Sequence, residues 1–290
     1  MSYWEMYCRF YVCPDVMVPR RSSECLVSTA ISHLTSQSSD TDSDRVNPTV
    51  SVLDLGTGSG CLLLSIVKGM QSVGTEKQVI GVGIDMSKEA LDVARENSLR
   101  LGVDDHTVFL SHSFNDLKTV WEAVELSLAN STNSDSSGGI GSSNSDSSDS
   151  KAGSTSHVKA FVDAGSLNGF DVIVCNPPYS TLEEVSRLSD SKRCYEPAQA
   201  LFTMGNSGPL GSYANIAQAI LGAGIEESTL PVVKKGTLPV VKKGTFFIFE
   251  IGSSQSHAVK TLYASVPTLE YVEEVLDFNG LVRCIVFKYV

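Results

Sequence analysis

Residues 50–60 have the sequence Val-Ser-Val-Leu-Asp-Leu-Gly-Thr-Gly-Ser-Gly, in which an apolar, β-branched run leads into a glycine-rich turn. The run predicts a buried strand over 50–54, and the periodicity after it predicts a helix over Gly60–Met70. Glycines permit positive φ angles and a close backbone approach, and the start of a helix presents free N–H groups. The turn therefore suits a carboxylate or a pyrophosphate, such as the methionine end of S-adenosylmethionine or a dinucleotide. A purely structural turn is the alternative.

The same change from a strand pattern to a helix pattern recurs along the chain. Further strands are predicted at 79–85, 107–111, 170–176 and 245–251, and helices at Ser87–Leu101 and Leu210–Ile225. Strands that alternate with helices form a mostly parallel sheet with helices on both faces. Near the end, the runs Leu269–Leu276 and Leu281–Tyr289 flank an Asn-Gly turn signal and predict an antiparallel hairpin. The sequence thus predicts an α/β, Rossmann-like fold with a mostly parallel seven-stranded sheet. This is the class I S-adenosylmethionine-dependent methyltransferase architecture rather than that of a dehydrogenase.

Composition restricts the function classes. The 290 residues carry a net charge of −11, which argues against a large nucleic-acid-binding face, although acidic serine-rich tracts supply part of that charge. The seven cysteines have no metal-ligand spacing, so we predict no metal site and expect a reducing compartment. No apolar run reaches the roughly 20 residues that a membrane span needs, and no signal-peptide pattern is present. We expect a soluble, intracellular monomer, in the cytoplasm or in an organelle such as a mitochondrion or plastid.

Low-complexity tracts interrupt the pattern. We expect an N-terminal segment over 1–35 and a methyltransferase domain over 36–290. A tract rich in Ser, Asn, Asp and Gly at about 127–156 buries too little apolar surface to offset its chain entropy, which predicts a disordered insertion. Regulatory phosphorylation of that tract is the functional alternative. The octad Thr-Leu-Pro-Val-Val-Lys-Lys-Gly occurs twice over 229–244 and predicts a duplicated loop that enters the next strand.

Residues at the ends of the predicted strands extend the glycine turn into a cofactor site. Asp85 ends the second predicted strand, where a carboxylate can accept both hydroxyls of a ribose; a charge at the start of the Ser87 helix is the structural alternative. Asp54 would brace the turn near the cofactor's amino group. After the third strand, Ser113 and Phe114 would contact the adenine, although Phe114 suits a core position equally well. The candidate cofactor-binding residues are Asp54, Gly56, Thr57, Gly58, Ser59, Gly60, Asp85, Ser113, Phe114 and Asn176.

The tetrapeptide Asn176-Pro177-Pro178-Tyr179 directly follows the fourth predicted strand. An amide or aromatic amine is a poor nucleophile because its nitrogen lone pair is delocalised. The Asn176 side-chain oxygen and the Pro177 carbonyl can accept both N–H bonds of such a group and aim its lone pair at a methyl donor. The prolines stiffen the loop, and Tyr179 can pack against the planar group. We therefore predict Asn176, Pro177 and Tyr179 as catalytic residues and Asn176, Pro177, Pro178 and Tyr179 as the substrate site. A proline loop that merely ends a core strand is the alternative.

Taken in order, these motifs resemble those of the release-factor glutamine methyltransferases, which methylate the glutamine of the Gly-Gly-Gln motif in peptide chain release factors. The resemblance runs from about Arg9 to Val290. It implies S-adenosylmethionine as the cofactor and a release factor as the protein partner, with the tetrapeptide holding the substrate glutamine. Beyond the motifs above, it rests on Val18-Pro19-Arg20 with Glu24, Tyr195-Glu196-Pro197 with Ala200-Leu201, Gly208 with Tyr213, Glu250-Ile251-Gly252 with Gln255, and Asp277, Gly280 and Arg283.

The chain departs from the family pattern in three places. Arg21-Ser22-Ser23 stands where the family usually has Pro-Glu or Pro-Asp. His112 and Ser113 stand where an acidic residue and an aromatic residue are usual, which puts the adenine contact in question. The N-terminal helical domain of bacterial relatives is essentially absent, so either the start is truncated or substrate docking uses other surfaces. Adenine amino-methylation of DNA or RNA is the alternative function, because the tetrapeptide can also hold a flipped base. A non-catalytic binding module is the third hypothesis.

Overall fold

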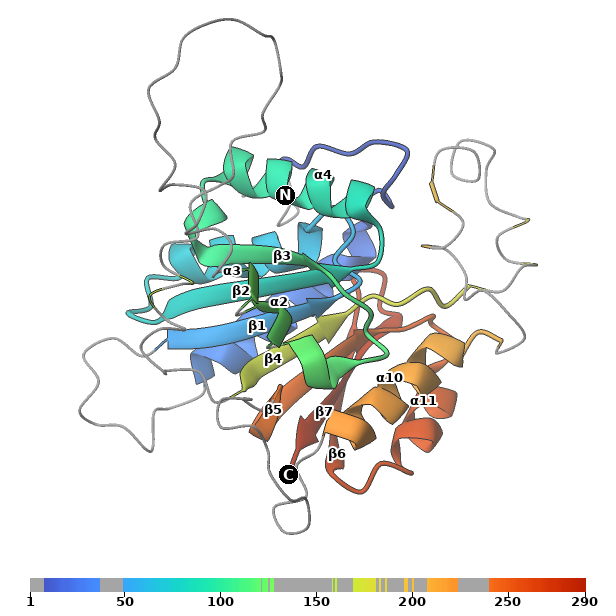
Figure 1. Cartoon of the computed structure of the whole chain (residues 1–290). Coiled ribbons are helices and arrows are strands. Elements are labelled where there is room, and N and C mark those ends of the chain that lie inside the picture. Colours follow the sequence, from blue (N-terminus) through green and yellow to red (C-terminus); the bar gives the residue numbers. More distant parts are fainter. Residues whose placement is uncertain are drawn as a thin grey trace, which may run out of the picture.

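The computed structural model of the chain describes residues 8–36, 49–120, 122–124, 126–127, 158, 160, 169–180, 183, 186, 196–197, 200, 208–223 and 240–290. Within these residues, a seven-stranded sheet forms the centre of the molecule (Figure 1). The strands lie in the order β3-β2-β1-β4-β5-β7-β6. Their bounds are β1 Thr49–Leu55, β2 Gln78–Asp85, β3 Thr107–Ser111, β4 Phe170–Cys175, β5 Val241–Glu250, β6 Leu269–Leu276 and β7 Val282–Tyr289.

The direction of the strands confirms the predicted fold. Strands β1 to β5 run parallel to one another, whereas β7 is antiparallel to both β5 and β6. The chain starts the sheet at β1, adds β2 and β3 on one side, and then crosses to β4 on the other side. In an open parallel sheet, such a reversal leaves a crevice at the carboxyl ends of the strands. The turn after β1 and the tetrapeptide after β4 both leave the sheet at this edge.

Helices cover both faces of the sheet (Figure 1). On one face lie α2 (Glu24–Ser36), α3 (Cys61–Ser72) and α4 (Lys88–Leu101), and their apolar side chains share a core with Val52 of β1. On the other face lie α10 (Gly211–Ala223) and α11 (Ser256–Tyr263), which share a core with Leu53. Neighbouring residues of one strand thus face opposite layers, as the period of a β-strand requires. Both faces are apolar, which explains the continuous apolar runs in the sequence.

The N-terminal segment packs into the same core as the sheet. Helix α2, which the sequence analysis did not identify, completely buries Leu26, Val27, Ala30 and Leu34. It contacts β4, β5, β6 and β7, whereas α3 and α4 contact β1, β2 and β3. The sulfur of Cys25 at its start lies 3.1 Å from that of Cys284 in β7. Residues far apart in the sequence therefore meet beside the carboxyl end of β5.

The start of β5 differs from the expectation. The strand begins at Val241 rather than at 245, so the end of the second octad is strand and not loop. Val240 and Val241 are 2% and 3% exposed, and Val241 pairs with Phe170, so burial of apolar side chains extends the strand backwards. Residues 229–239 of the octad pair, and 128–156 of the expected insertion, lie outside the described residues. None of the helices in the described part of the chain is long and apolar enough to cross a membrane.

Candidate functional site

The glycine-rich turn between β1 and α3 is held against the end of β2. The backbone N–H groups of Gly56 and Thr57 both donate to the Ile84 carbonyl, each at 2.9 Å. Gly56, Gly58 and Gly60 have φ angles of +73°, +54° and +78°. Residues with a Cβ are strained in this region, so the turn needs its three glycines.

The space around the three glycines differs. A Cβ at Gly60 would lie 2.9 Å from Leu64 Cδ1 and 3.2 Å from the Cβ of Ala94, because α3 and α4 pack closely there. At Gly56 and Gly58, nothing lies within 4 Å of the position that a Cβ would take. Gly60 therefore serves packing, whereas the first two glycines leave the main chain open to a ligand.

Asp85, the last residue of β2, links its strand to the turn. Its Oδ2 accepts a hydrogen bond from the Gly58 N–H at 2.9 Å, and its Oδ1 accepts one from the Ser87 N–H at 3.0 Å. The Ser87 hydroxyl in turn caps α4 by accepting from the Ala90 N–H at 3.1 Å. Each carboxylate oxygen can accept more than one hydrogen bond, so these contacts leave capacity for a ribose hydroxyl. Asp85 thus lies at the turn, as predicted, and also at a helix start.

The side chains of Asp54, Thr57 and Ser59 are buried beneath the turn, at 0%, 4% and 2% exposure. The Thr57 hydroxyl donates to Asp54 Oδ2 at 2.8 Å. Burial raises the pKa of the Asp54 carboxyl to about 7, against the lowering effect of the Thr57 hydroxyl and the Leu63 backbone N–H. Thr57 and Ser59 can therefore meet a ligand only through their main chain, and Asp54 lies where it can brace the turn.

The end of β3 lies beside the end of β2. The His112 N–H donates to the Asp85 carbonyl at 3.0 Å, so the residues after β3 border the same edge. The Ser113 hydroxyl accepts from the Asn115 N–H at 3.2 Å. Phe114 is half-buried and packs against the core on the α10 face, which is the alternative that the sequence left open.

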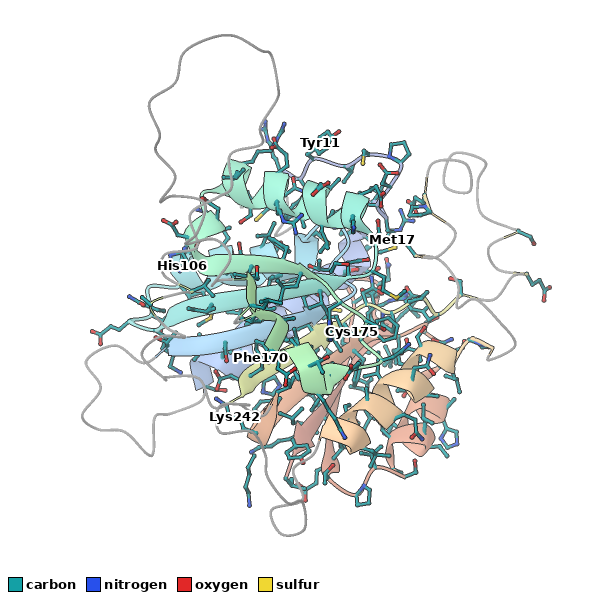
Figure 2. The ribbon with its side chains drawn as sticks, in the orientation of Figure 1. Tyr11, Met17, His106, Phe170, Cys175 and Lys242 are labelled. Atoms are coloured by element: carbon teal, nitrogen blue, oxygen red, sulfur yellow. The ribbon has the colours of Figure 1, made fainter. Side chains whose placement is uncertain are left out.

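The tetrapeptide leaves β4 next to the glycine turn. Leu55 pairs with Cys175 in the register of β1 and β4, and the Cys175 thiol donates to the Leu55 carbonyl at 3.1 Å. Figure 2 shows Cys175 at the end of β4, opposite Phe170 at its start. Asn176 therefore follows its strand at the level of Gly56. The structure brings together the two motifs that the sequence predicted to form one site.

Three side chains from later in the sequence hold the tetrapeptide. The Ser212 hydroxyl donates to the Pro178 carbonyl at 3.2 Å, and Gln255 Nε2 donates to the Tyr179 carbonyl at 3.0 Å. The Tyr179 hydroxyl donates to Glu250 Oε1 at 3.1 Å. Sequence reasoning assigned no role to Glu250 or Gln255 beyond the family resemblance, because no local pattern connects them with residues 176–179.

Charged residues gather behind Tyr179. Glu250 has no exposed surface, and this burial raises the pKa of its carboxyl, although Ser23, Tyr179, Arg283 and Arg20 lower it. The Arg283 guanidinium also donates to the Ile251 carbonyl at 3.1 Å. A buried carboxylate is costly unless cations and hydrogen-bond donors surround it. This cluster therefore indicates a constrained arrangement rather than a solvated surface.

Two of these charges come from the segments that carry the family resemblance. Arg20 and Glu196 form an ion pair of 2.5 Å, in which the Glu196 side chain is only 2% exposed. Arg283 pairs with Asp277 at 3.3 Å, and the Asp277 side chain is 1% exposed. The N-terminal segment, the chain after the tetrapeptide and the C-terminal hairpin thus converge on one side of the site.

Asn97 is a further supporting residue that sequence reasoning missed. Its Nδ2 donates to the carbonyls of Ser59 and Tyr11, each at 2.9 Å, and its Oδ1 accepts from the Tyr11 N–H. It fixes the glycine turn against the N-terminal segment from α4. The sequence contained one signal for it, the helical spacing. Asn97 lies seven residues after Ala90 and three after Ala94, and all three are on the buried face of α4.

A pocket of about 150 Å³ adjoins the tetrapeptide. Its lining is polar, so the Tyr179 side of the site borders solvent-accessible space beside the ends of β5 and β7. The lining residues are Tyr179, Ser180, Gly252, Ser253, Ser254, Gln255 and Arg283.

Comparison with known proteins shows a methyltransferase domain and similarity to one kind of enzyme. Residues 47–136 match a family model described as Methyltransferase domain. The release factor glutamine methyltransferases of Caulobacter vibrioides and Bacillus subtilis are 29% and 28% identical to the chain over 231 and 276 residues. These alignments cover 79% and 95% of this chain, but 54% and 69% of the two relatives. The chain thus spans about half to two-thirds of their length.

Among solved structures, the catalytic domain of hMettl16 in complex with the MAT2A 3′UTR hairpin 6 has a TM-score of 0.52. The match covers 99% of this chain and 77% of that chain, at 12% identity. Such a low identity shows a shared fold and nothing about a shared substrate. By sequence the chain is similar to the release factor glutamine methyltransferases, and its fold is that of a class I methyltransferase.

Proposed function

We propose that the chain transfers a methyl group from S-adenosylmethionine to the side-chain amide nitrogen of a glutamine in a peptide chain release factor, the glutamine of its Gly-Gly-Gln motif. The observation that carries the proposal is the pairing of Leu55 with Cys175, which places the glycine turn and the tetrapeptide side by side. A methyl donor on the turn and an amide on the tetrapeptide would be neighbours. The names of the curated relatives support the substrate class.

The glycine turn fits S-adenosylmethionine. Gly56 and Gly58 leave open space beside their main chain, and the N–H groups at the start of α3 can donate hydrogen bonds to the carboxylate of the cofactor. Asp85 would hold the ribose hydroxyls while it keeps its bond to Gly58. The buried pair of Asp54 and Thr57 would fix the turn from below. The chemistry that the cofactor supplies is an electrophilic methyl group on a sulfonium.

The tetrapeptide would prepare the amide for transfer. The Asn176 side-chain oxygen and the Pro177 carbonyl accept the two N–H bonds of the glutamine amide, and Tyr179 covers its planar face. This alignment can supply about 7–11 kcal/mol of the barrier. Positive charge would develop on the nitrogen as the methyl carbon leaves the sulfonium sulfur, which becomes a neutral thioether, and the two acceptors would stabilise that charge. The surplus proton is then acidic and leaves to solvent.

Adenine amino-methylation of DNA or RNA, the alternative predicted from the same tetrapeptide, is not favoured. A polynucleotide substrate requires a cluster of Lys and Arg that neutralises phosphates, and the chain has a net charge of −11. The curated relatives are named for a protein substrate. The RNA in the hMettl16 structure belongs to a protein that shares only the fold.

Labelled S-adenosylmethionine discriminates between these substrates. The protein is incubated with a release factor, with the same factor in which the motif glutamine is alanine, and with an oligonucleotide that contains unpaired adenines. The proposal predicts label only in the unaltered release factor. Label in the oligonucleotide alone, or equal label in both release factors, would contradict it.

A further inference from the structure

Glu250 ends β5 in the interior of the protein, where its side chain accepts a hydrogen bond from Tyr179, a predicted catalytic residue. We propose that Glu250 is a positioning residue, which holds the tetrapeptide in its reactive shape by accepting the hydroxyl hydrogen bond of Tyr179. The inference rests on the proposed function, because it assigns a part in the same transfer step. It adds a residue that would act through another one, without contact with substrate or cofactor.

The contacts of the tetrapeptide show why this bond is distinct. Ser212 and Gln255 bind carbonyl oxygens, so they hold the main chain of Pro178 and Tyr179. Among the described residues, Glu250 is the one that accepts a hydrogen bond from the ring end of Tyr179. With the main chain fixed on one side and the hydroxyl on the other, the ring has a single orientation.

Glu250 is itself held in place from several directions. The Tyr213 hydroxyl donates to its main-chain carbonyl at 2.7 Å. The nearby positive charges of Arg283 and Arg20 favour the ionised form of its side chain and so lower its pKa against the effect of burial. Its main chain also pairs with Cys284 of β7, so the C-terminal hairpin helps to fix the position of Glu250.

The stiffness of the tetrapeptide transmits this constraint to Asn176. A proline ring fixes φ, and a residue before proline is confined to extended conformations. Pro177 and Pro178 thus leave little freedom between Asn176 and Tyr179. An orientation imposed on the Tyr179 ring therefore restricts the place of the Asn176 oxygen, which is the group expected to bind the substrate amide.

Substitutions at position 250 test the proposal when compared with a change at Tyr179. Glu250→Gln keeps an acceptor oxygen, whereas Glu250→Ala removes it. We expect kcat on the release factor to fall about tenfold in Glu250→Ala, the size of one hydrogen bond to a carboxylate, and less than threefold in Glu250→Gln. KM for the release factor should change less than kcat, because the bond shapes the reactive arrangement rather than the docking surface. Tyr179→Phe should resemble Glu250→Ala, and the double variant should lose little more than either single variant.

Hydrogen–deuterium exchange of the peptide that contains residues 176–180 gives a readout without turnover. Exchange should be faster in Glu250→Ala and in Tyr179→Phe, and close to wild type in Glu250→Gln. Glu274→Ala is the matched control: it removes a carboxylate of β6 that pairs with Lys260 of α11 at 3.3 Å, and exchange at 176–180 should not change.

The two readouts separate the possible failures. If the wild-type protein does not methylate a release factor but exchange follows the expected order, the proposed function fails and the role of Glu250 stands. Wild-type exchange and kcat in folded Glu250→Ala would overturn the role of Glu250. Multiplicative losses in the double variant would overturn it as well, because the two residues would then act independently.

Discussion

The glycine turn and the tetrapeptide follow adjacent strands, yet the contacts that hold them come from different distances along the chain. Thr57 binds Asp54, three residues away, and Gly58 binds Asp85, 27 residues away. The tetrapeptide is held by side chains that are 34, 71 and 76 residues further on. The turn is thus largely a product of one β-α-β unit. The tetrapeptide takes its shape only from the completed sheet.

This difference has a functional consequence. Substitutions in the C-terminal half should disturb substrate alignment while cofactor binding persists. Substitutions around β1 and β2 should chiefly lower the affinity for the cofactor.

Asn176→Ala removes one of the two acceptors proposed for the substrate amide. We expect kcat on a release factor to fall about 10²- to 10³-fold, as for the loss of one preorganised catalytic hydrogen bond. Steady-state rates at saturating cofactor measure this. Asn215→Ala, at an exposed position of α10, is the matched control and should keep wild-type kcat. Unchanged kcat in Asn176→Ala would remove the role assigned to the tetrapeptide.

Asp85→Ala should act on the other half of the site. Loss of the carboxylate removes the bond to Gly58 and the proposed bonds to the ribose, so the dissociation constant for S-adenosylmethionine should rise about 10- to 100-fold. Isothermal titration calorimetry measures this affinity. Glu96→Ala, which breaks an exposed pair with Arg100 on α4, should leave it unchanged. Wild-type affinity in Asp85→Ala would contradict the assigned role of Asp85. Either the turn would bind the cofactor without this carboxylate, or the cofactor would bind elsewhere.

The buried carboxyl of Asp54 should make the free energy of unfolding depend on pH. Burial raises the pKa of its carboxyl from 3.8 to about 7, so between these values the folded chain retains a proton that the unfolded chain has lost. The free energy of unfolding should therefore fall as pH rises from about 4 to 7. Asn does not ionise, so Asp54→Asn should remove about 3 kcal/mol of this decline.

Chemical denaturation of both proteins at several pH values measures this contribution. The two pH profiles should converge at the acid end and separate towards neutral pH, with the variant the more stable there. Parallel profiles would show that Asp54 is ionised in the folded protein across the whole range.

Gly60→Ala should lower the free energy of unfolding slightly. The part of this loss that comes from close packing must be separated from the part that comes from backbone strain. Gly102, the C-cap of α4, has a similar φ of +64° against +78°, but a Cβ there would meet nothing within 4 Å. Gly102→Ala therefore reports strain alone, whereas Gly60→Ala adds the contact with Ala94. We expect Gly60→Ala to cost about 1 kcal/mol more in the free energy of unfolding. Equal costs would mean that α3 and α4 can move apart freely.

The sequence predicted the features that depend on short-range patterns. The apolar runs and the Asn-Gly turn were sufficient for a parallel sheet with an antiparallel hairpin. The glycine spacing located the turn, since Gly56 and Gly58 need positive φ whatever packs around them. The strand ends placed Asp85 and the tetrapeptide at one edge of the sheet, because parallel strands share a direction.

What the sequence did not predict depends on contacts between distant segments. Helix α2 has only a modest apolar stripe, and the sheet face that it covers exists only after β4 to β7 have assembled. The ion pair of Arg20 with Glu196 joins residues that are 176 positions apart. The role of Glu250 depends on the register of β5, which places its side chain on Tyr179. No local pattern contains this information.

The glycine turn and the tetrapeptide are proposed to present a methyl donor and a glutamine amide to one another. Fragment-ion mass spectrometry of a release factor, after incubation with the protein and S-adenosylmethionine, tests this arrangement. The account predicts a single added methyl group on the side chain of the motif glutamine, and its loss when Asn176→Ala replaces the wild-type protein. A methyl group on another residue, or one that Asn176→Ala installs at the normal rate, would contradict the account.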